Sequence, residues 1–270
     1  MTSSNLLNQF LLGITFAFII VFFSYRLKFL TLSGSIATFV LAGIIFSLGG
    51  IKWSVPILTF FIPSSLLSKF RKEKNQDVEL FFEKSNTRDH FQVLANGGIG
   101  GFLVLLNFFY PDEYFYLMYL ASLSAVCSDT WATEIGTWKK NKTYNITTLK
   151  PTEQGVSGGI SLLGSFGALL GTIVIAISGI FWINFNYNFY FALIIVSGLT
   201  GSFVDSILGA TVQLKNKCIV CGKITERHFH CEKQTTFYKG LNWINNDVVN
   251  FFAAFSGSVV IFILLIIKNF

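Results

Sequence analysis

The fold is decided by a stretch of 25 residues without any charged side chain, residues 158–182, which reads GGISLLGSFGALLGTIVIAISGIFW. At about 1.5 Å per residue, a helix of this length crosses the roughly 30 Å of hydrocarbon in a membrane. The whole chain has the same character, since 52% of its 270 residues are hydrophobic and 13% are charged, against about 25% charged residues in a soluble domain. The composition therefore excludes a water-soluble fold.

Seven similar apolar runs flank this one, so we predict an all-α polytopic membrane protein with about eight transmembrane helices in one domain, residues 1–270. The third run is short and contains Pro56 and Pro63, so we expect it to be kinked or only partly inserted. The eight runs are Leu6 to Ser24, Leu30 to Gly50, Trp53 to Leu67, Val93 to Phe109, Tyr114 to Ala132, Gly158 to Trp182, Phe189 to Gln213 and Val248 to Ile267.

The basic residues indicate the orientation of these helices. Of the 20 Lys and Arg residues, all except Lys52 and Lys268 fall in alternate loops, with Lys84 among them. Basic loops are retained on the cytoplasmic side, so we expect both termini outside and the basic loops inside a prokaryotic cytoplasmic membrane. The net charge of +6 suits anionic lipid headgroups or phosphorylated substrates. Nucleic acid is not expected as a partner, because no stacking platform accompanies the charge.

Two acidic residues fall within apolar runs. Asp129 precedes Lys139 by ten residues, and Asp205 precedes Lys215 by ten, which is about 15 Å along a helix. The two carboxylates should therefore lie at similar depth beneath the basic face. Carboxylates inside a bilayer are costly and usually functional. The alignment of Asp129 with Asp205 also hints at an internal repeat of helix pairs.

Three helices that start at the basic face open with polar or glycine-rich residues, which attract anions to their N-termini. In the first of them, Arg88, Gln92 and Asn96 are spaced by four and share one stripe, where they could grip a phosphate. Arg88 could instead be an interfacial anchor. The other two openings are Gln154 to Ile160, with Gly155, Ser157, Gly158 and Gly159, and Asn245 to Asn250.

Hard oxygen ligands for Mg²⁺ are available from Asp129, Glu134, Asp205 and Asp247. Asp247 could instead serve only the dipole of its helix. Lys150 and the neighbouring hydroxyls could be no more than loop residues. Alternative roles in close helix packing fit four glycines, namely Gly159, Gly164, Gly167 and Gly171.

The last basic loop, residues 214–240, carries a Cys/His knuckle. Its pattern is Cys218-x2-Cys221 followed by His228-x2-Cys231, with His230 nearby. This spacing suits a tetrahedral structural Zn²⁺ site, and a cytoplasmic location would keep the thiols reduced. Unligated thiols are the alternative.

These segments resemble the transmembrane protein 19 family, also called domain of unknown function 92, whose plant member is phytyl-phosphate kinase. The resemblance covers nearly the whole chain. The Asp-Thr-x-Ala-x-Glu-x-Gly core is also similar to the Gly-Asp-x2-Ala motif of CTP-dependent dolichol and phytol kinases, with Ser128 in place of the glycine. The matching stretches are Arg88-x3-Gln92-x3-Asn96-Gly97, Ser128 to Gly136, Gly155 to Gly159, Asp205-Ser-x-Leu-Gly-Ala-Thr-x-Gln213 and Asn246-x3-Asn250.

The resemblance implies a membrane-embedded kinase that converts an isoprenyl monophosphate to a diphosphate with CTP or ATP. In this hypothesis Asp129, Glu134, Asp205 and Asp247 hold Mg²⁺. Phosphate charge would be offset by Arg88, Lys150 and residues 155–159, and oxygens would be oriented by Gln92, Asn96, Gln213, Asn246 and Asn250. A small-solute or ion transporter with a carboxylate-lined site is the alternative. It would need polar residues on both sides of the membrane, whereas the outer halves of these helices are almost wholly apolar.

Overall fold

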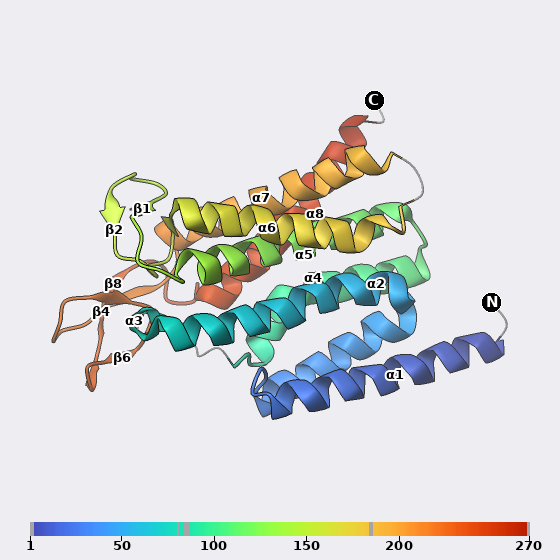
Figure 1. Cartoon of the computed structure of the whole chain (residues 1–270), viewed down its shortest axis with the longest axis horizontal. Helices are drawn as coiled ribbons and strands as arrows, with labels where there is room; N and C mark the ends of the chain where they lie inside the picture. Colours follow the sequence, from blue (N-terminus) through green and yellow to red (C-terminus); the bar gives the residue numbers. More distant parts are fainter. Residues whose placement is uncertain (1–2, 80, 84–86, 184–185, 269–270) are drawn as a thin grey trace.

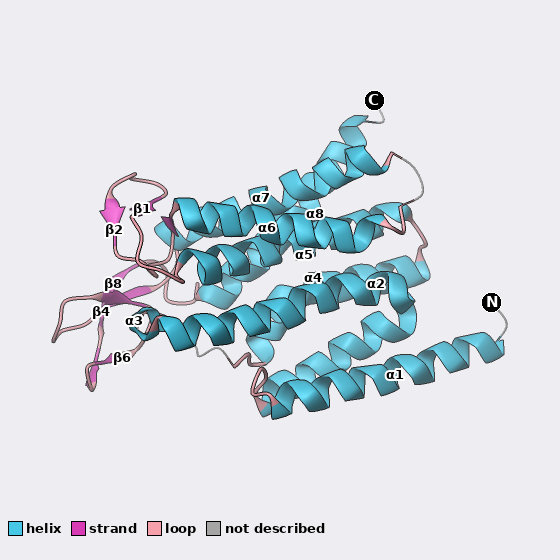
Figure 2. Cartoon of the chain, in the orientation of Figure 1, coloured by secondary structure: helices cyan, strands magenta, loops and turns pink. Residues whose placement is uncertain are grey.

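A computed structural model describes residues 3–79, 81–83, 87–183 and 186–268. Lys84, one of the basic-loop residues, lies outside this range. Helices dominate the fold, and short strands gather at one end of the bundle (Figures 1 and 2). The helices are α1 (Ser3–Arg26), α2 (Leu32–Lys74), α3 (Gln76–Glu79), α4 (His90–Phe109), α5 (Glu113–Gly136), α6 (Leu162–Ile180), α7 (Tyr187–Thr211) and α8 (Asn246–Lys268).

The expected all-α membrane fold is confirmed, but the number of eight helices is slightly too high. Six of the described helices, α1, α2, α4, α6, α7 and α8, are long and apolar enough to cross a membrane. The second and third predicted runs form one element, α2, of 43 residues. Its two arms fold back on each other in Figure 1, so the alternation of helix directions is kept.

The break in α2 falls at Gly50, where the second predicted run ends, but the prolines of the third run do not kink it as expected. Gly50 has φ 63° and ψ −159°, whereas the backbone around Pro56 and Pro63 stays helical. Glycine adopts a positive φ without steric cost, because it has no Cβ. Proline only weakens a helix, whereas a glycine with positive φ can reverse the direction of the chain.

Pro56 is tolerated because two tyrosines of α5 supply the missing hydrogen bonds. Proline has no N–H and displaces the carbonyl four residues earlier, here that of Lys52. The Tyr116 hydroxyl donates to the Lys52 carbonyl oxygen at 3.2 Å. The Tyr119 hydroxyl donates to the carbonyl oxygen of Trp53 and accepts from the N–H of Ile57. Side chains of a neighbouring helix thus supply hydrogen bonds to the backbone groups of the interrupted turn, as apolar surroundings require.

We expect Tyr119→Phe to destabilise the fold by about 1–3 kcal/mol, because it leaves buried backbone groups of α2 without partners. Thermal unfolding in detergent should show this as a lowered midpoint. Tyr25→Phe is the matched control, since Tyr25 is exposed on α1. Equal midpoints for the two variants would contradict this account of the α2 turn.

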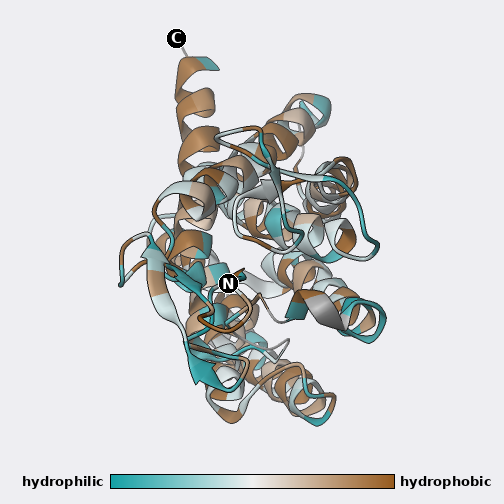
Figure 3. Cartoon of the chain, turned by 90° about the vertical axis from the view of Figure 1, so that its left-hand side faces the viewer, coloured by the Kyte–Doolittle hydropathy of each residue, from teal (hydrophilic) through white to brown (hydrophobic). Residues whose placement is uncertain are grey.

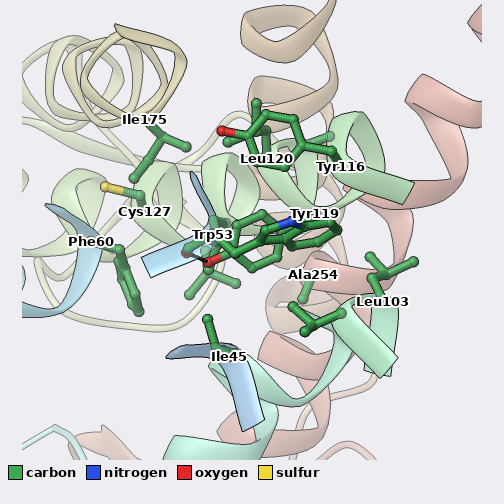
Figure 4. Packing of buried hydrophobic residues seen from close by; sticks show 14 of the residues in the cluster. Ile45, Trp53, Phe60, Leu103, Tyr116, Tyr119, Leu120, Cys127, Ile175 and Ala254 are labelled. Carbon is green, nitrogen blue, oxygen red and sulfur yellow. Dashed lines mark hydrogen bonds between the residues drawn. The ribbon is translucent and has the colours of Figure 1, made fainter. Parts of the chain in front are cut away.

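The centre of the bundle is α5, which contacts α2, α4, α6, α7 and α8. Its residues from Tyr119 to Ser128 are all buried. Figure 4 shows Tyr119 packed against Trp53 among Ile45, Leu103 and Ala254. Because its middle is enclosed by other helices and not by lipid, α5 can carry polar residues that lower its apolarity below that of the six candidate spans.

The glycines of α6 let it approach α5 closely. A Cβ at Gly167 would lie 2.4 Å from the Trp131 carbonyl oxygen, and one at Gly171 would lie 2.7 Å from that of Cys127. Such contacts are typical of small residues at helix interfaces in membranes. The packing interpretation of Gly167 and Gly171 is therefore confirmed.

Three small antiparallel arrangements of strands lie at the end of the bundle opposite the first turn of α1 and the last turn of α8 (Figure 1). Seen from this end, hydrophilic residues follow the connecting segments, while the outer helices are largely hydrophobic (Figure 3). Two sheets have the orders β2-β1-β3 and β5-β4-β8, and β6 pairs with β7. The strands are β1 (Thr143–Asn145), β2 (Pro151–Thr152), β3 (Gly159–Ile160), β4 (Lys215–Lys217), β5 (Ile224–Thr225), β6 (Phe229–His230), β7 (Lys233–Gln234) and β8 (Thr236–Lys239).

Candidate active site

A cavity of about 490 Å³ lies at the strand-bearing end of the bundle, between α4, α5, α6, α7, α8 and residues 154–161. It brings together nearly every side chain that the sequence singled out. The predicted residues that line it are Arg88, Gln92, Asn96, Asp129, Glu134, Gly155, Ser157, Gly158, Gly159, Asp205, Gln213, Asn246, Asp247 and Asn250.

Among the residues predicted for the kinase site, Lys150 is the exception. It precedes β2, its side chain is exposed, and it is not among the residues lining the cavity. Its carbonyl oxygen accepts a hydrogen bond from the N–H of Asn145 at 2.9 Å. The geometry therefore favours the loop interpretation of Lys150 over a phosphate contact.

Asp129 of α5 and Asp205 of α7 meet in the cavity. Their carboxyl groups lie within hydrogen-bonding contact of each other, and Asp205 is 9% exposed. The Oδ2 atom of Asp205 is buried and has no hydrogen-bond partner among the described residues. Two adjacent buried carboxylates repel each other unless they share a proton or a cation. The pair therefore has the donor chemistry that Mg²⁺ requires, one or two carboxylates with room for further oxygens.

Asp247 lies in the first turn of α8, where it is 6% exposed and lines the cavity. The N-terminus of α8 is capped by another residue, because the Oδ1 atom of Asn245 accepts from the N–H of Val248 at 3.1 Å. Asp247 therefore does not cap α8, but as an acidic residue of its first turn it does interact favourably with the helix dipole, as the alternative interpretation held. Asn246 and Asn250 line the cavity from the same end of α8.

Glu134 lines the cavity and is bound to α2. Its Oε1 atom accepts a hydrogen bond from the Ser68 hydroxyl at 2.6 Å, and its Oε2 atom accepts one from Nε of Arg71. Arg71 also contacts Glu79. Both carboxylate oxygens of Glu134 are therefore engaged by α2, and the residue holds Arg71 at the cavity wall; its role as a magnesium ligand stays a prediction.

Arg88, Gln92 and Asn96 all line the cavity, but their side chains make different contacts. Gln92 belongs to a capping box, in which its Oε1 atom accepts from the N–H of Asp89 at 3.2 Å. The Oδ1 atom of Asn96 is buried without a hydrogen-bond partner among the described residues. The Arg88 guanidinium lies 5.4 Å and 5.3 Å from the ring centroids of Phe60 and Phe61. Arg88 and Asn96 remain available to a ligand.

The segment 154–161 forms a tight wall of the cavity. Gly155 and Gly158 have φ values of 92° and 78°, and a Cβ at Gly158 would lie 2.5 Å from the Cβ of Ala210. The Nε2 atom of Gln154 fastens the segment to the end of α5 by donating to the carbonyl oxygens of Gly136 and Lys139, both at 2.8 Å. The positive φ and the close contact with Ala210 both require glycine at position 158, so that the segment can pack against α7.

Glu226, between β5 and β6, is a cavity residue that the sequence did not reveal. Its Oε1 atom accepts hydrogen bonds from the Ser157 hydroxyl and from Nε2 of Gln213, the latter at 2.8 Å. Burial raises the pKa of Glu226 to about 6. Lys215 donates from Nζ to the Ser157 carbonyl oxygen at 2.7 Å. The knuckle pattern around Glu226 assigns it no role, so only the fold identifies it.

Arg71 was also missed, although a signal existed. Ser64, Ser68 and Arg71 recur every three or four residues in the apolar α2, and all three are buried. Polar residues on one stripe of a membrane helix indicate an interior face. The basic composition at the end of α2 concealed this pattern, because Arg71 was attributed to the topology signal.

The knuckle in the last loop brings together Cys218, Cys221, His230 and Cys231, whose ligand atoms all lie within 4.8 Å of one another. The spacing had indicated His228 as the fourth ligand, and this is wrong. His228 is largely exposed and lies 3.7 Å from Glu83. Strand β6 instead directs His230 toward the thiols.

Comparison with known proteins finds relatives that match over two thirds or more of this chain. The chain is 32% identical over 257 residues to Protein PGR of Arabidopsis thaliana, covering 86% of this chain and 88% of that protein. It is 28% identical to the uncharacterized membrane protein MJ0933 of Methanocaldococcus jannaschii, covering 67% and 74% of the two chains. It is 23% identical to Protein VTE6, chloroplastic, of Arabidopsis thaliana, covering 86% and 64%. No solved structure matches.

The family model described as integral membrane protein DUF92 matches residues 15–258, which is most of the chain. This range includes every residue that lines the cavity. The chain therefore belongs to the integral membrane protein family DUF92.

Proposed function

We propose that this protein is a Mg²⁺-dependent kinase that transfers a phosphoryl group from CTP or ATP to an isoprenyl monophosphate and yields the diphosphate. The motifs that resemble those of phytyl-phosphate kinase support this reaction class. The observation that carries the proposal is one cavity that is lined by carboxylates and an arginine and also, where α6 and α7 pack together, by apolar side chains.

The apolar wall lies where α6 and α7 pack together. Ala168 of α6 and Leu199 and Phe203 of α7 line the cavity, and Phe203 is 56% exposed on the outer surface of the bundle. An isoprenyl tail could thus leave the cavity between α6 and α7 and lie in the membrane. A soluble phosphate ester has no use for such a wall.

The polar side suits two phosphorylated substrates. Asp129 and Asp205 would hold Mg²⁺, with Asp247 close by, and the metal would neutralise charge on the donor phosphates. Arg88 would bind an equatorial oxygen of the transferred group, because it has no carboxylate partner in the part of the chain that the structure describes. Asn96 and the backbone of residues 155–159 would orient further oxygens.

The reaction needs positioning more than covalent help from the protein. An oxygen of the lipid monophosphate forms a bond to the γ-phosphorus, while the bond from that phosphorus to the β–γ bridging oxygen breaks. The electron pair of the broken bond leaves with the nucleoside diphosphate. Since the attacking phosphate is already anionic, no general base is required. Ser128, in place of the glycine of CTP-dependent kinases, leaves the choice between CTP and ATP to measurement.

We further propose that the strand-bearing end faces the cytoplasm of a prokaryotic cell, where both nucleotides occur. The basic residues of its loops support this orientation. Membrane lipids would then surround the exposed apolar side chains of the outer helices, such as Phe18 of α1 and Phe102 of α4.

The test is an assay of the protein reconstituted in vesicles with Mg²⁺, labelled CTP or ATP and a series of prenyl monophosphates of increasing length. We expect labelled diphosphate, with KM falling as the chain lengthens, because apolar burial contributes about 0.8 kcal/mol per CH₂. Ala168→Phe should raise KM for the lipid about tenfold or more without changing KM for the nucleotide. Leu169→Phe is the matched control, since Leu169 is more exposed and does not line the cavity. Solute flux without turnover would instead indicate a transporter.

A further inference from the structure

Outside the cavity, the strongest unassigned cluster is the Cys/His knuckle between α7 and α8. We propose that Cys218, Cys221, His230 and Cys231 bind one Zn²⁺ and that this ion fixes the loop that places Glu226 in the cavity wall. The proposal is independent of the kinase reaction, because it concerns the shape of the loop and not the phosphoryl transfer.

The distances fit tetrahedral coordination. Zn–S bonds of about 2.3 Å and Zn–N bonds of about 2.0–2.1 Å at tetrahedral angles place sulfur and nitrogen ligands about 3.5 Å apart. The Nδ1 atom of His230 lies 3.6 Å from Sγ of Cys221 and 3.2 Å from Sγ of Cys231. All four ligand atoms lie within 4.8 Å of one another. A small shift of side chains is enough to enclose an ion.

The backbone around Cys218 supports the same conclusion. The N–H of Val220 donates to Sγ of Cys218 at 3.4 Å, and the N–H of Gly222 donates to the Cys218 carbonyl oxygen at 3.0 Å. Gly222 has φ 72°, a conformation natural to glycine. The chain thus turns tightly enough to direct both thiols of the Cys-x2-Cys pair to one point, and an N–H donor stabilises the thiolate that a metal requires.

The turn between β6 and β7 supplies the other two ligands. Cys231 and Glu232 have φ values of 51° and 61°, and they are the two central residues of the hairpin in which His230 pairs with Lys233. Two-residue hairpin turns with positive φ at both positions favour Asn-Gly. Neither Cys nor Glu prefers this conformation, so a bond from Cys231 to a metal would offset its cost.

The closed loop is docked onto the segment before α4. Thr225 and Glu226 donate to the carbonyl oxygen of Phe81, through Oγ1 at 3.1 Å and through the N–H at 2.9 Å. Arg227 donates to the carbonyl oxygens of Glu79 and Phe82 at 2.7 Å and 2.8 Å. These contacts hold the loop in a position where the carboxylate of Glu226 reaches the Ser157 hydroxyl. With four protein ligands the zinc shell is complete, so the ion shapes this wall and performs no chemistry.

The experiment measures metal content by mass spectrometry in the full-length protein purified in detergent. We expect about one zinc per chain in the wild type. His230→Ala and Cys221→Ser should each lower this at least twofold. His228→Ala is the matched control and should keep the zinc, because His228 points away toward Glu83.

A second pair of variants separates metal loss from misfolding of the turn. Cys231→Asn combined with Glu232→Gly keeps a favourable turn but removes a ligand, so the zinc content should fall. The thermal midpoint of this double variant should fall only by the amount that the metal contributes to stability. Glu232→Gly alone should keep the zinc. The proposal is overturned if wild-type protein supplied with Zn²⁺ contains none, if its thiols are found as a disulfide, or if His228→Ala loses the metal and His230→Ala does not.

Discussion

Asp129→Asn should lower kcat of the proposed kinase by about 10²–10³-fold, the loss typical when one preorganised electrostatic contact to a transferred group is removed. The amide is neutral and coordinates a hard cation more weakly than a carboxylate. Asp205→Asn should have a similar effect, because the two carboxylates lie in contact in the cavity. The measurement is steady-state turnover as a function of Mg²⁺ concentration, in which both variants should require more metal for half-maximal activity.

The pair should also act as a unit. Residues that share one task show strongly non-additive effects, so the double variant should be little worse than either single one. Asp112→Asn is the matched control, since Asp112 caps the other end of the same helix and asparagine caps equally well. Unchanged turnover and metal requirement in Asp129→Asn would remove the basis of the proposed function.

Arg88→Gln should reduce kcat/KM by about 10²-fold or more, and Arg88→Lys should recover only part of this loss. A guanidinium binds phosphate oxygens in a fixed two-pronged geometry that an ammonium cannot reproduce. The fold should survive, because the backbone of Arg88 is anchored independently of its side chain: its N–H donates to Phe29 at 2.9 Å, and its carbonyl oxygen accepts from Thr31 at 3.0 Å.

The control for this variant is Arg26→Gln, because Arg26 likewise lies over a phenylalanine ring, 5.6 Å from the centroid of Phe22, but does not line the cavity. We expect wild-type kinetics for it. Equal effects of the two substitutions would mean that Arg88 serves only as an interfacial anchor, which was the alternative interpretation of its position.

Residues with periodic or compositional signals could be assigned in advance. Asp129 and Asp205 could be recognised because a carboxylate in an apolar run is costly, and their equal distances from the basic loops placed them at one depth. Arg88 and Asn96 could be recognised from their spacing of four. The internal repeat suggested by this alignment stays a prediction.

Other roles could not be assigned from the sequence because they depend on which partner each side chain meets. Glu134 had the chemistry of a metal ligand, but Ser68 and Arg71 on α2 engage both of its oxygens. His228 had the better sequence spacing, but the β6–β7 hairpin presents His230 to the thiols. Glu226 gave no signal, since its place in the cavity follows from long-range contacts with Ser157 and Phe81.

By itself the sequence determined that the chain crosses a membrane, that its basic loops share one end, and that two acidic residues lie at equal depth beneath it. These properties follow from hydrophobicity and from the rise per residue of a helix, which are local. The tertiary structure alone decided that α5 is the central helix, that Ser68 and Arg71 of α2 engage both oxygens of Glu134, and that Glu226 lies in the cavity wall. Each of these depends on contacts between residues far apart in the chain, which no local pattern encodes.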